Sequence, residues 1–184
     1  MTAHPPEHSG QAISILKVQP YSDRGIVLTS DGVSPDGWID PRHAADGDNL
    51  SPPLSWNEVE GAGAYALIVE DPDAPREKPF VHWLAWNIPG QYTALPEGVP
   101  NQGWLESPQN MVQGRNDMHE PGWFGPRPPP GHGVHRYHFQ LFALDGPLEL
   151  GPEADLTTLL SAIKGRTIAD GELVGTYETP AEPT

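Results

Sequence analysis

The stretch YALIVEDPDAPREKPFVHWLAWNI, from Tyr65 to Ile88, holds two apolar runs separated by an acidic, proline-containing turn. A short run of consecutive apolar residues bounded by turn residues is typical of a buried strand. The first run ends at Asp71, with Asp73 just beyond it, and the second run has His82 at its start. The sequence therefore predicts two strands whose neighbouring ends can bring two carboxylates and one imidazole together.

A third segment supplies partners for these groups, because residues Gly131 to Leu144 read GHGVHRYHFQLFAL. Successive side chains of a strand point to opposite faces, so His135 and Tyr137 share one face, which continues into apolar core positions. Arg136 and His138 face the other way. We expect Arg136 to pair with a carboxylate behind the sheet, and His138 to lie outside any pocket formed on the first face.

Proline and glycine punctuate the rest of the chain, with 23 prolines and 20 glycines among 184 residues. This is well above their average usage of about 5% and 7%. The run GPRPPP is expected to be a stiff loop, because proline lacks a backbone donor and fixes φ. Short apolar runs between these residues predict a mostly β protein. The expected strands are Ile13 to Val18, Gly25 to Thr29, Tyr65 to Asp71, His82 to Ile88, His135 to Leu144 and Glu172 to Tyr177.

One helix is expected near the end of the chain, where apolar residues recur at helical spacing after Asp155, a good N-cap residue. The apolar positions are Leu156, Leu159, Leu160 and Ile163. Gly165 is expected to close the helix. A helix with one apolar face should cover a sheet.

The composition limits the classes of function. Asp and Glu total 25 against 10 Lys and Arg, and the resulting formal charge of −15 argues against binding a nucleic-acid backbone or an anionic membrane surface. The chain has no cysteine, which excludes disulfides and cysteine chemistry. We expect one domain over residues 13–178, with flexible segments at 1–12 and 179–184. No segment reads as a signal peptide or a membrane span, so we expect a cytoplasmic protein without stable membrane insertion.

Several motifs together are typical of one protein family. They are DNLSPPLSW (Asp48 to Trp56), DPDAP (Asp71 to Pro75), HWLAWNIP (His82 to Pro89), GPRPP (Gly125 to Pro129), GHGVHRYHFQLFAL (Gly131 to Leu144) and GELVGTYE (Gly171 to Glu178). In this order they resemble the phosphatidylethanolamine-binding protein family, most of all its bacterial and archaeal branch, often called Raf kinase inhibitor-like. The resemblance covers roughly residues 13 to 178.

This resemblance implies a β-sandwich built around a large antiparallel sheet, with a few peripheral helices and a small anion-binding pocket near one end. Segment 101–131 would form one wall of that pocket. The family's ligand-binding positions fall on Asp71, Asp73, Pro75, His82, Gly125, Pro126, His135 and Tyr137. Imidazole, phenol and loop N–H groups can all donate hydrogen bonds to a phosphate or carboxylate oxygen. Arg127 departs from the family pattern, and it can either strengthen anion binding at the rim or point into solvent.

The two aspartates need a separate explanation, because an ionised carboxylate repels an anion. They can hold the histidines in one tautomer and favour protonated imidazole, or one of them can donate if it is itself protonated. On the residues alone, other interpretations stay open: Asp71 and Asp73 as turn formers, His82 as a core histidine, and His135 and Tyr137 as half-buried strand residues.

Two metal-binding interpretations are also open. His132, His135 and His138 recur every third residue, but on a strand the last two face opposite sides. His82 and His135 with one aspartate would resemble a two-histidine, one-carboxylate site. Since nothing supplies a fuller ligand set, we expect no metal and no other cofactor.

The leading hypothesis is a binding protein that holds a small anionic ligand, such as a phosphate ester, through His82, His135, Tyr137 and loop amides. The alternative is an isomerase, cyclase or hydrolase that uses an aspartate (Asp71 or Asp73) and a histidine of the same pocket as acid and base. No nucleophile elbow or phosphate-binding glycine motif supports a particular reaction, so binding ranks first. A homodimer is possible, nucleic acid is not an expected partner, and the sequence identifies no surface for a protein partner.

Overall fold

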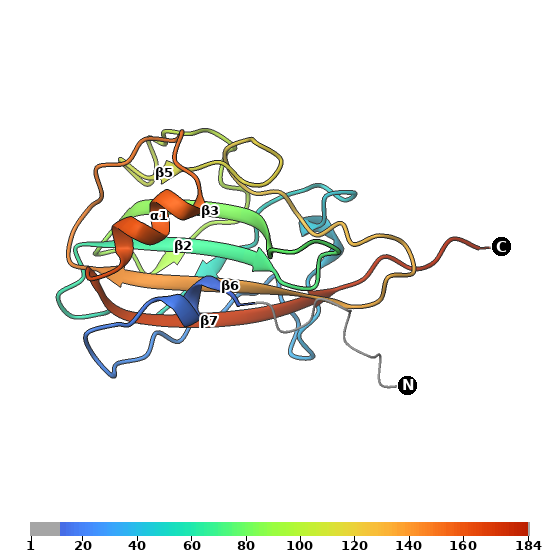
Figure 1. Ribbon diagram of the computed structural model, residues 1–184, viewed down its shortest axis with the longest axis horizontal. Helices are drawn as coiled ribbons and strands as arrows, with labels where there is room; N and C mark the ends of the chain where they lie inside the picture. Colours follow the sequence, from blue (N-terminus) through green and yellow to red (C-terminus); the bar gives the residue numbers. More distant parts are fainter. Residues whose placement is uncertain (1–11, 184) are drawn as a thin grey trace.

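The computed structural model describes residues 12–183 and is organised around a five-stranded antiparallel sheet with the strand order β5-β3-β2-β6-β7 (Figure 1). Its strands are β2 (Ala64–Asp71), β3 (Phe80–Pro89), β5 (Val112–Gln113), β6 (His135–Leu144) and β7 (Thr167–Tyr177). A smaller sheet pairs β1 (Leu54–Ser55) with β4 (Ala94–Leu95), after the 3-10 helix η2 (Pro41–His43). The prediction of a mostly β fold around a large antiparallel sheet is confirmed.

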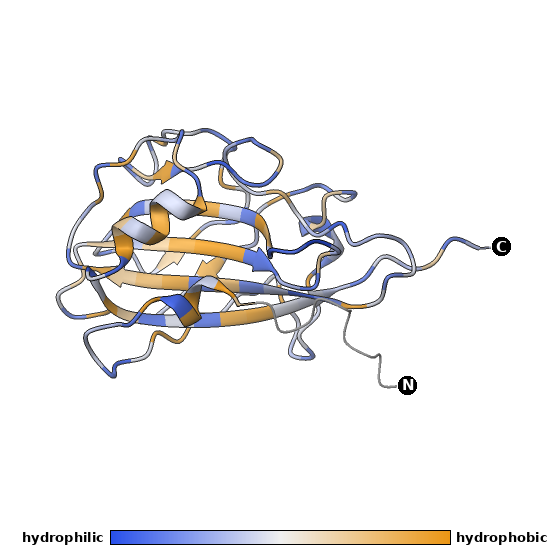
Figure 2. Ribbon diagram, viewed as in Figure 1, coloured by the Kyte–Doolittle hydropathy of each residue, from blue (hydrophilic) through white to orange (hydrophobic). Residues whose placement is uncertain are grey.

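Strand β2 lies at the centre of the large sheet, and every one of its residues is buried. Tyr65, Leu67 and Val69 pack into an apolar cluster on one face, and Ala66 and Ile68 pack into a second cluster on the other face. A strand covered on both faces needs no polar alternation, which explains its continuous apolar run. Figure 2 shows apolar residues concentrated along β2, β3 and β6, with hydrophilic residues at the end of β2.

Helix α1 (Leu156–Ile163) covers one face of the large sheet, over β2 and β3 (Figure 1). Asp155 caps the helix by accepting a hydrogen bond from the N–H three residues further on, at 3.0 Å. Leu159 and Ile163 are fully buried against the sheet. The predicted helix is confirmed, and Gly165 beyond it has a φ of +78°, a left-handed conformation that favours glycine.

The N-terminal apolar run does not form the predicted strand Ile13 to Val18. That prediction is wrong, because the run folds as the 3-10 helix η1 (Ser14–Lys17). The first N–H and the serine hydroxyl of η1 both donate to the Glu70 carboxylate, at 2.9 and 2.6 Å, and the next N–H donates to the Gln140 side-chain oxygen at 2.7 Å. Side chains of the sheet thus satisfy backbone donors that a strand would have given to a ladder.

The predicted strand Gly25 to Thr29 is also wrong, because in the described structure this segment makes only isolated bridges at its two ends. One end pairs with Asp170 of β7 and the other with Ser55 of β1. A segment whose two ends pair with different sheets cannot extend a single ladder. The last predicted strand, Glu172 to Tyr177, is present but longer, since β7 begins at Thr167.

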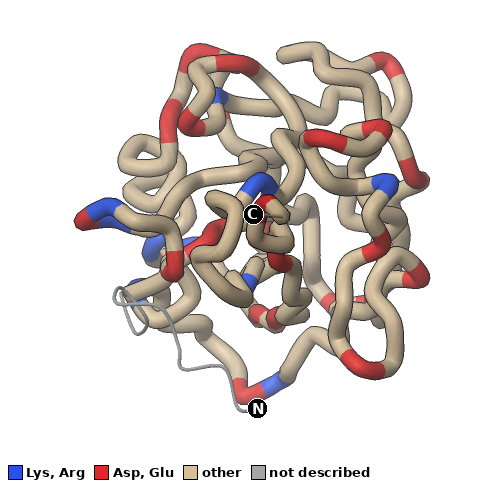
Figure 3. Tube along the Cα trace, turned by 90° about the vertical axis from the view of Figure 1, so that its right-hand side faces the viewer, with Lys and Arg blue, Asp and Glu red and all other residues tan. Residues whose placement is uncertain are grey.

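Acidic residues occur at many separate positions of the fold, as Figure 3 shows for the end of the molecule that carries the C-terminus. Within residues 12–183, no helix is both long enough and apolar enough to cross a membrane. The predicted flexible segment 1–12 lies outside the described residues, except for Ala12. Residues 179–183 have no regular secondary structure, and Thr179 O accepts the Gly131 N–H at 3.1 Å, so their flexibility stays a prediction.

Candidate functional site

Three strands of the large sheet have neighbouring ends at one end of the sheet, and these ends surround a small cavity of about 160 Å³. Strand β2 ends at Asp71, β3 begins at Phe80 and β6 begins at His135, and antiparallel pairing brings these ends together. A loop that includes the proline run closes the cavity. The lining residues are Asp71, Ala74, Pro75, Phe80, His82, Phe124, Arg127, Pro128, Pro129, His135 and Tyr137.

Asp71 and His135 form a buried pair in the wall of the cavity. His135 Nδ1 lies 2.7 Å from Asp71 Oδ2, and the two side chains are 1% and 4% exposed. The other oxygen of Asp71 accepts the Asp73 N–H at 2.8 Å. His135 Nε2 lies 2.6 Å from His132 Nδ1, so both ring nitrogens of His135 have partners. A carboxylate only accepts, so this pair fixes the proton of His135 on Nδ1.

His82 reaches the cavity from β3 with one ring nitrogen engaged. Its Nδ1 lies 2.6 Å from Phe124 O, and because a carbonyl only accepts, Nδ1 carries the proton. Burial lowers the pKa of His82 below its ordinary value, although Asp71 and the Phe124 carbonyl act in the opposite direction. His82 is therefore neutral near pH 7 with its lone pair on Nε2, an atom that makes no hydrogen bond within residues 12–183.

Tyr137 places its phenol beside His82, with the two ring centroids 5.0 Å apart in an edge-to-face arrangement. The side chain is fully buried, and burial together with the charges of Asp71 and Asp73 raises the pKa of Tyr137 well above its ordinary value. The hydroxyl therefore stays protonated and can donate one hydrogen bond to a ligand.

Asp73, a predicted pocket residue, does not line the cavity and pairs with Arg136. Its Oδ2 accepts the main-chain N–H and the Nε of Arg136, each at 2.9 Å, and its Oδ1 accepts Nη2 at 2.7 Å. Burial raises the pKa of Asp73, but the hydrogen bonds and charge of Arg136 outweigh burial, so the net pKa is lowered. The expected pairing of Arg136 with a carboxylate is confirmed, and that carboxylate is Asp73.

The predicted wall residues differ in position. Pro75 lines the cavity, whereas Gly125 and Pro126 do not. The Gly125 N–H donates to Asn49 Oδ1 at 2.8 Å, so this amide is already engaged. A Cβ on Gly125 would collide with the His43 carbonyl oxygen. Glycine at this position therefore lets the proline loop pack closely against the segment around η2.

Sequence analysis missed several apolar residues that close the cavity. Phe80 precedes His82 by two positions and so shares its strand face, a signal that period-two alternation offers. Phe124 stacks on His82 with ring centroids 5.8 Å apart, but it lies in a loop where no periodicity marks it. Pro128 and Pro129 line the cavity within the run predicted to be a stiff loop.

The fixed charges of the lining are few and opposed. Asp71 contributes one carboxylate, and Arg127 contributes the one permanent cation among the lining residues. The Arg127 side chain is 62% exposed, and its Nε lies 3.5 Å from Asp46 Oδ1. With His82 neutral, the cavity has no clear excess of positive charge before a proton is added.

The three histidines that recur every third residue, His132, His135 and His138, do not converge on one point. His132 and His135 contact each other, whereas His138 lies with its Nδ1 3.2 Å from Glu172 Oε2. Within residues 12–183, no group of three or more His, Asp or Glu side chains is arranged to hold a metal ion. The contacts of these histidines are those of a hydrogen-bond network.

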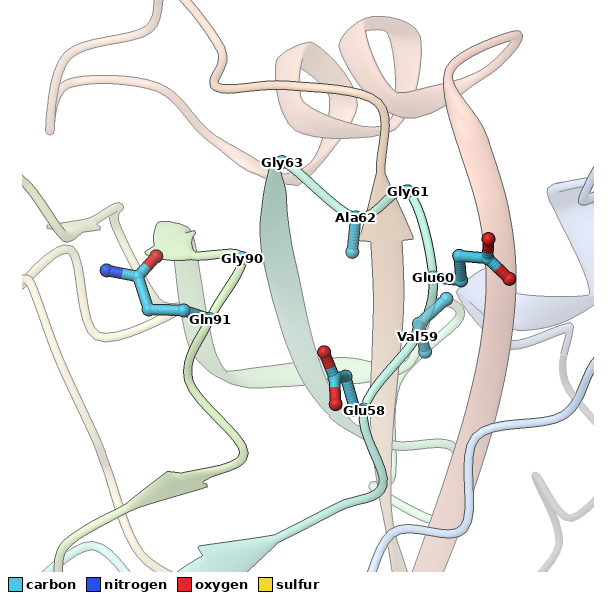
Figure 4. A pocket seen from close by; sticks show the side chains of 8 residues that line it. All are labelled: Glu58, Val59, Glu60, Gly61, Ala62, Gly63, Gly90 and Gln91. Atoms are coloured by element: carbon cyan, nitrogen blue, oxygen red, sulfur yellow. The ribbon is translucent and has the colours of Figure 1, made fainter.

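A larger cavity, of about 730 Å³, lies at the opposite end of the sheet, beside the start of β2 and the end of β3 (Figure 4). It is lined by Glu58, Val59, Glu60, Gly61, Ala62, Gly63, Gly90 and Gln91. These residues include no histidine, tyrosine or basic side chain, and the two carboxylates disfavour an anion. Of these two cavities, the smaller one therefore suits an anion better.

A family model described as phosphatidylethanolamine-binding protein matches residues 29–178. A UPF0098 protein of Pyrococcus abyssi is 46% identical over 144 residues, which is 78% of this chain and 80% of that protein. The crystal structure of Escherichia coli YbcL has a TM-score of 0.76 at 30% identity and covers 84% of this chain and 99% of that chain. Mycobacterium tuberculosis LppC, named as a candidate lipoprotein, is 37% identical over 140 residues, which is 72% of this chain and 62% of that protein.

Proposed function

The chain belongs to the phosphatidylethanolamine-binding protein family, in its bacterial and archaeal branch, and we propose that its small cavity binds an anionic group such as a phosphate or carboxylate. The observation that carries this proposal is the convergence of Asp71, His82, His135 and Tyr137 on one cavity. These side chains bring potential hydrogen-bond donors into a space closed by aromatic and proline residues. Pro75 also lines the cavity, and Asp73, Gly125 and Pro126 would support it from behind.

The cavity can enclose only the head group of a ligand. Its volume of about 160 Å³ compares with about 30 Å³ for one water in the liquid and several hundred Å³ for a whole drug-sized ligand. A phosphate or carboxylate fits this space, and the rest of a larger ester would extend past Arg127. Free phosphate and phosphate esters are therefore expected to compete for one site.

Anion binding requires the cavity to gain positive charge, because the fixed charges of Asp71 and Arg127 offset each other. An anion favours the protonated form of a nearby imidazole, so one pocket histidine takes up a proton as the anion enters. Tyr137 donates without any change in protonation. The affinity for an anion is therefore expected to rise as the pH falls from about 8 to about 6.

A thermal-shift and mass-spectrometric survey with phosphate, phosphate esters, sulfate and small carboxylates tests this function. An anion at about 100 times its Kd adds about 2.7 kcal/mol to the free energy of unfolding, which raises the Tm by roughly 5–11 °C for a domain of this size. Wild type should respond, and His135→Asn should respond much less. His119→Asn is the matched control, because His119 is exposed and does not line the cavity. Equal responses of wild type and His135→Asn would refute this site.

A second candidate function is an isomerase, cyclase or hydrolase that uses the same residues, and the state of His82 favours it. A neutral imidazole with a bare Nε2 suits a general base, and His135 beside Asp71 suits an acid once it carries a second proton. Conversion of small phosphate or carboxylate compounds by wild type, lost in His82→Asn, would support catalysis. Stabilisation by an anion without conversion of any compound would favour binding alone.

We also propose that the protein acts in the cytoplasm and can form a homodimer. A chain without cysteine loses nothing in a reducing compartment. Recovery of the native protein with membranes after cell fractionation would refute the cytoplasmic location. Light scattering of the purified chain would distinguish a monomer from a dimer, and a monomer at all concentrations would refute the dimer.

A further inference from the structure

Three hydrogen-bonded side chains, Asp71, His135 and His132, connect the end of β2 to the loop before β6. His135 Nδ1 lies 2.7 Å from Asp71 Oδ2, and His135 Nε2 lies 2.6 Å from His132 Nδ1, with the two imidazole centroids 4.9 Å apart. His135 is buried and lines the cavity, whereas His132 is half-buried and does not line it. These hydrogen bonds thus connect the cavity wall to a histidine nearer the surface.

The geometry of these hydrogen bonds determines how many protons the two imidazole rings hold. Asp71 accepts the Nδ1–H of His135, and a hydrogen bond between two imidazole nitrogens holds one proton. Both rings are then neutral when His132 Nε2 is bare. A proton added at His132 Nε2 gives the two rings one positive charge. Transfer of the bridging proton then moves that charge to His135 without breaking a hydrogen bond.

We propose that His132 is a positioning residue of the anion site, through which the His132–His135 pair takes up one proton from water when an anion binds. This inference rests on the proposed function and identifies the source of the positive charge that the cavity needs. The carboxylate of Asp71 orients the pair and stabilises its cationic form. His132 acts through His135 and does not touch the ligand.

The surroundings of the pair favour a positive charge at this place. The charged and titratable groups on the elements around the pair are Asp71 and Asp73 from the end of β2, His82 from β3, Arg127 from the proline loop, Arg136 and Tyr137 from β6, and Tyr177 from β7. Arg136 is held by Asp73, and Arg127 is largely exposed. Asp71 is therefore the fixed charge in direct contact with the pair.

His82 is a poorer acceptor for this proton. It is enclosed by Phe80, Phe124 and Tyr137, and its Nδ1–H is fixed on the Phe124 carbonyl. Burial lowers the pKa of His82, so its cationic form is disfavoured. The half-buried His132 can exchange protons with water more readily.

The backbone holds His132 in a defined place. The His132 N–H donates to Pro129 O at 3.0 Å, and the Gly131 N–H donates to Thr179 O at 3.1 Å. Gly131 and Gly133 have φ values of +73° and +97°, left-handed conformations that suit glycine. The run GHG therefore presents one imidazole to the first residue of β6.

Calorimetric titration with sulfate, whose charge is constant near neutral pH, measures the protons taken up on binding. Titrations near pH 7 in two buffers of different ionisation enthalpy should give about one proton per sulfate in wild type and far less in His132→Gln. Glutamine can still donate to His135 Nε2 but cannot carry a charge. We expect His132→Gln to weaken sulfate binding about tenfold near pH 6 and little near pH 8.5. His119→Asn should match wild type in both measurements.

The outcomes separate this inference from the function on which it rests. Unchanged proton uptake in His132→Gln would overturn the inference and leave anion binding intact. Tighter binding by His132→Gln would also overturn it, because His132 would then compete with the ligand for His135. If wild type binds neither sulfate, phosphate nor a carboxylate, the proposed function fails, and the inference fails with it.

A measurement on the ligand-free protein tests whether the two histidines share a proton. Nitrogen-15 NMR of the imidazole rings in ligand-free protein should show a coupling between His132 Nδ1 and His135 Nε2 across their hydrogen bond. His132→Gln should abolish this coupling, whereas His119→Asn should not. Absence of the coupling in wild type would refute the shared proton whether or not an anion binds.

Discussion

Replacement of Asp73 tests whether this carboxylate stabilises the fold or binds a ligand. The side chain is fully buried and accepts hydrogen bonds from the main-chain N–H, Nε and Nη2 of Arg136. In Asp73→Asn the remaining oxygen can keep two of these bonds, but the new amide N–H group faces Nη2, so one bond and the charge are lost. Asp73→Ala loses all three bonds.

The expected loss of stability follows from the burial of the two partners. Breaking a buried ion pair typically costs about 3–5 kcal/mol, and a hydrogen bond to a charged group contributes about 1.5–3 kcal/mol. The Arg136 side chain is 38% exposed, so water can partly replace the carboxylate. We therefore expect losses of about 2 kcal/mol for Asp73→Asn and about 3 kcal/mol for Asp73→Ala, which lower the Tm by roughly 4–8 °C and 6–12 °C.

The stability difference between wild type and Asp73→Asn should also depend on pH. Because the pKa of Asp73 is lowered in the folded protein, the contribution of the pair is present in full above about pH 5 and is lost as the pH falls through the folded pKa. The difference in free energy of unfolding should therefore be constant near neutral pH and shrink in acid.

Urea unfolding followed by tryptophan fluorescence measures these free energies, and sulfate calorimetry on the same variants measures binding. Asp46→Asn is the control, because it removes an exposed contact with Arg127 and should change stability by less than about 0.5 kcal/mol. Asp73→Asn should lose stability and still bind sulfate, since Asp73 does not line the cavity. A large loss of sulfate binding with unchanged stability would refute this reasoning and return Asp73 to the binding site.

Three further predictions concern the cavity and its loop. Because burial lowers the pKa of His82, the unfolded chain binds this proton more readily, so the free energy of unfolding should fall as the pH drops below about 6.5. Urea unfolding of His82→Phe should show a smaller fall, and an identical pH dependence would contradict the burial argument. Tyr137→Phe removes a donor to the anion and should weaken sulfate binding by about 1.5–3 kcal/mol in calorimetry, whereas unchanged affinity would exclude the phenol from the site. Gly125→Ala should lower the free energy of unfolding by about 1–3 kcal/mol, because its Cβ would collide with the His43 carbonyl. Gly133→Ala should lower it by about 1 kcal/mol, because its Cβ would meet nothing within 4 Å but its φ is +97°. Equal losses of Tm in the two variants would contradict the packing argument.

The central strands and the helix could be predicted from sequence because their signals are local. The apolar runs of β2 and β3 and the alternation of β6 mark buried strands, and the Asp155 cap with its apolar spacing marks α1. The N-terminal helix η1 could not be predicted in this way. The mostly apolar segment ISILKV, residues 13–18, reads the same whether its N–H groups donate to a ladder or to side chains. Glu70 and Gln140, distant in the chain, determine the outcome.

The candidate site could be predicted only as far as each strand extends. His135 and Tyr137 lie within β6, where alternation assigns them to one face. Asp71 and Asp73 are also two positions apart, but β2 ends at Asp71, so alternation no longer applies to the second carboxylate. Asp73 instead turns toward Arg136, and no local pattern indicates which of the two aspartates takes the arginine.

The arrangement of these two carboxylates is what makes an anion site beside Asp71 physically reasonable. Arg136 lies near enough to Asp71 for their charges to interact, so without Asp73 it would attract the Asp71 carboxylate away from His135. Asp73 prevents this by holding the guanidinium, and its main-chain N–H also anchors one oxygen of Asp71. The other oxygen is then directed at His135. Asp71 then repels an incoming anion less, because the proton that the His132–His135 pair gains offsets the negative charge of the Asp71 carboxylate.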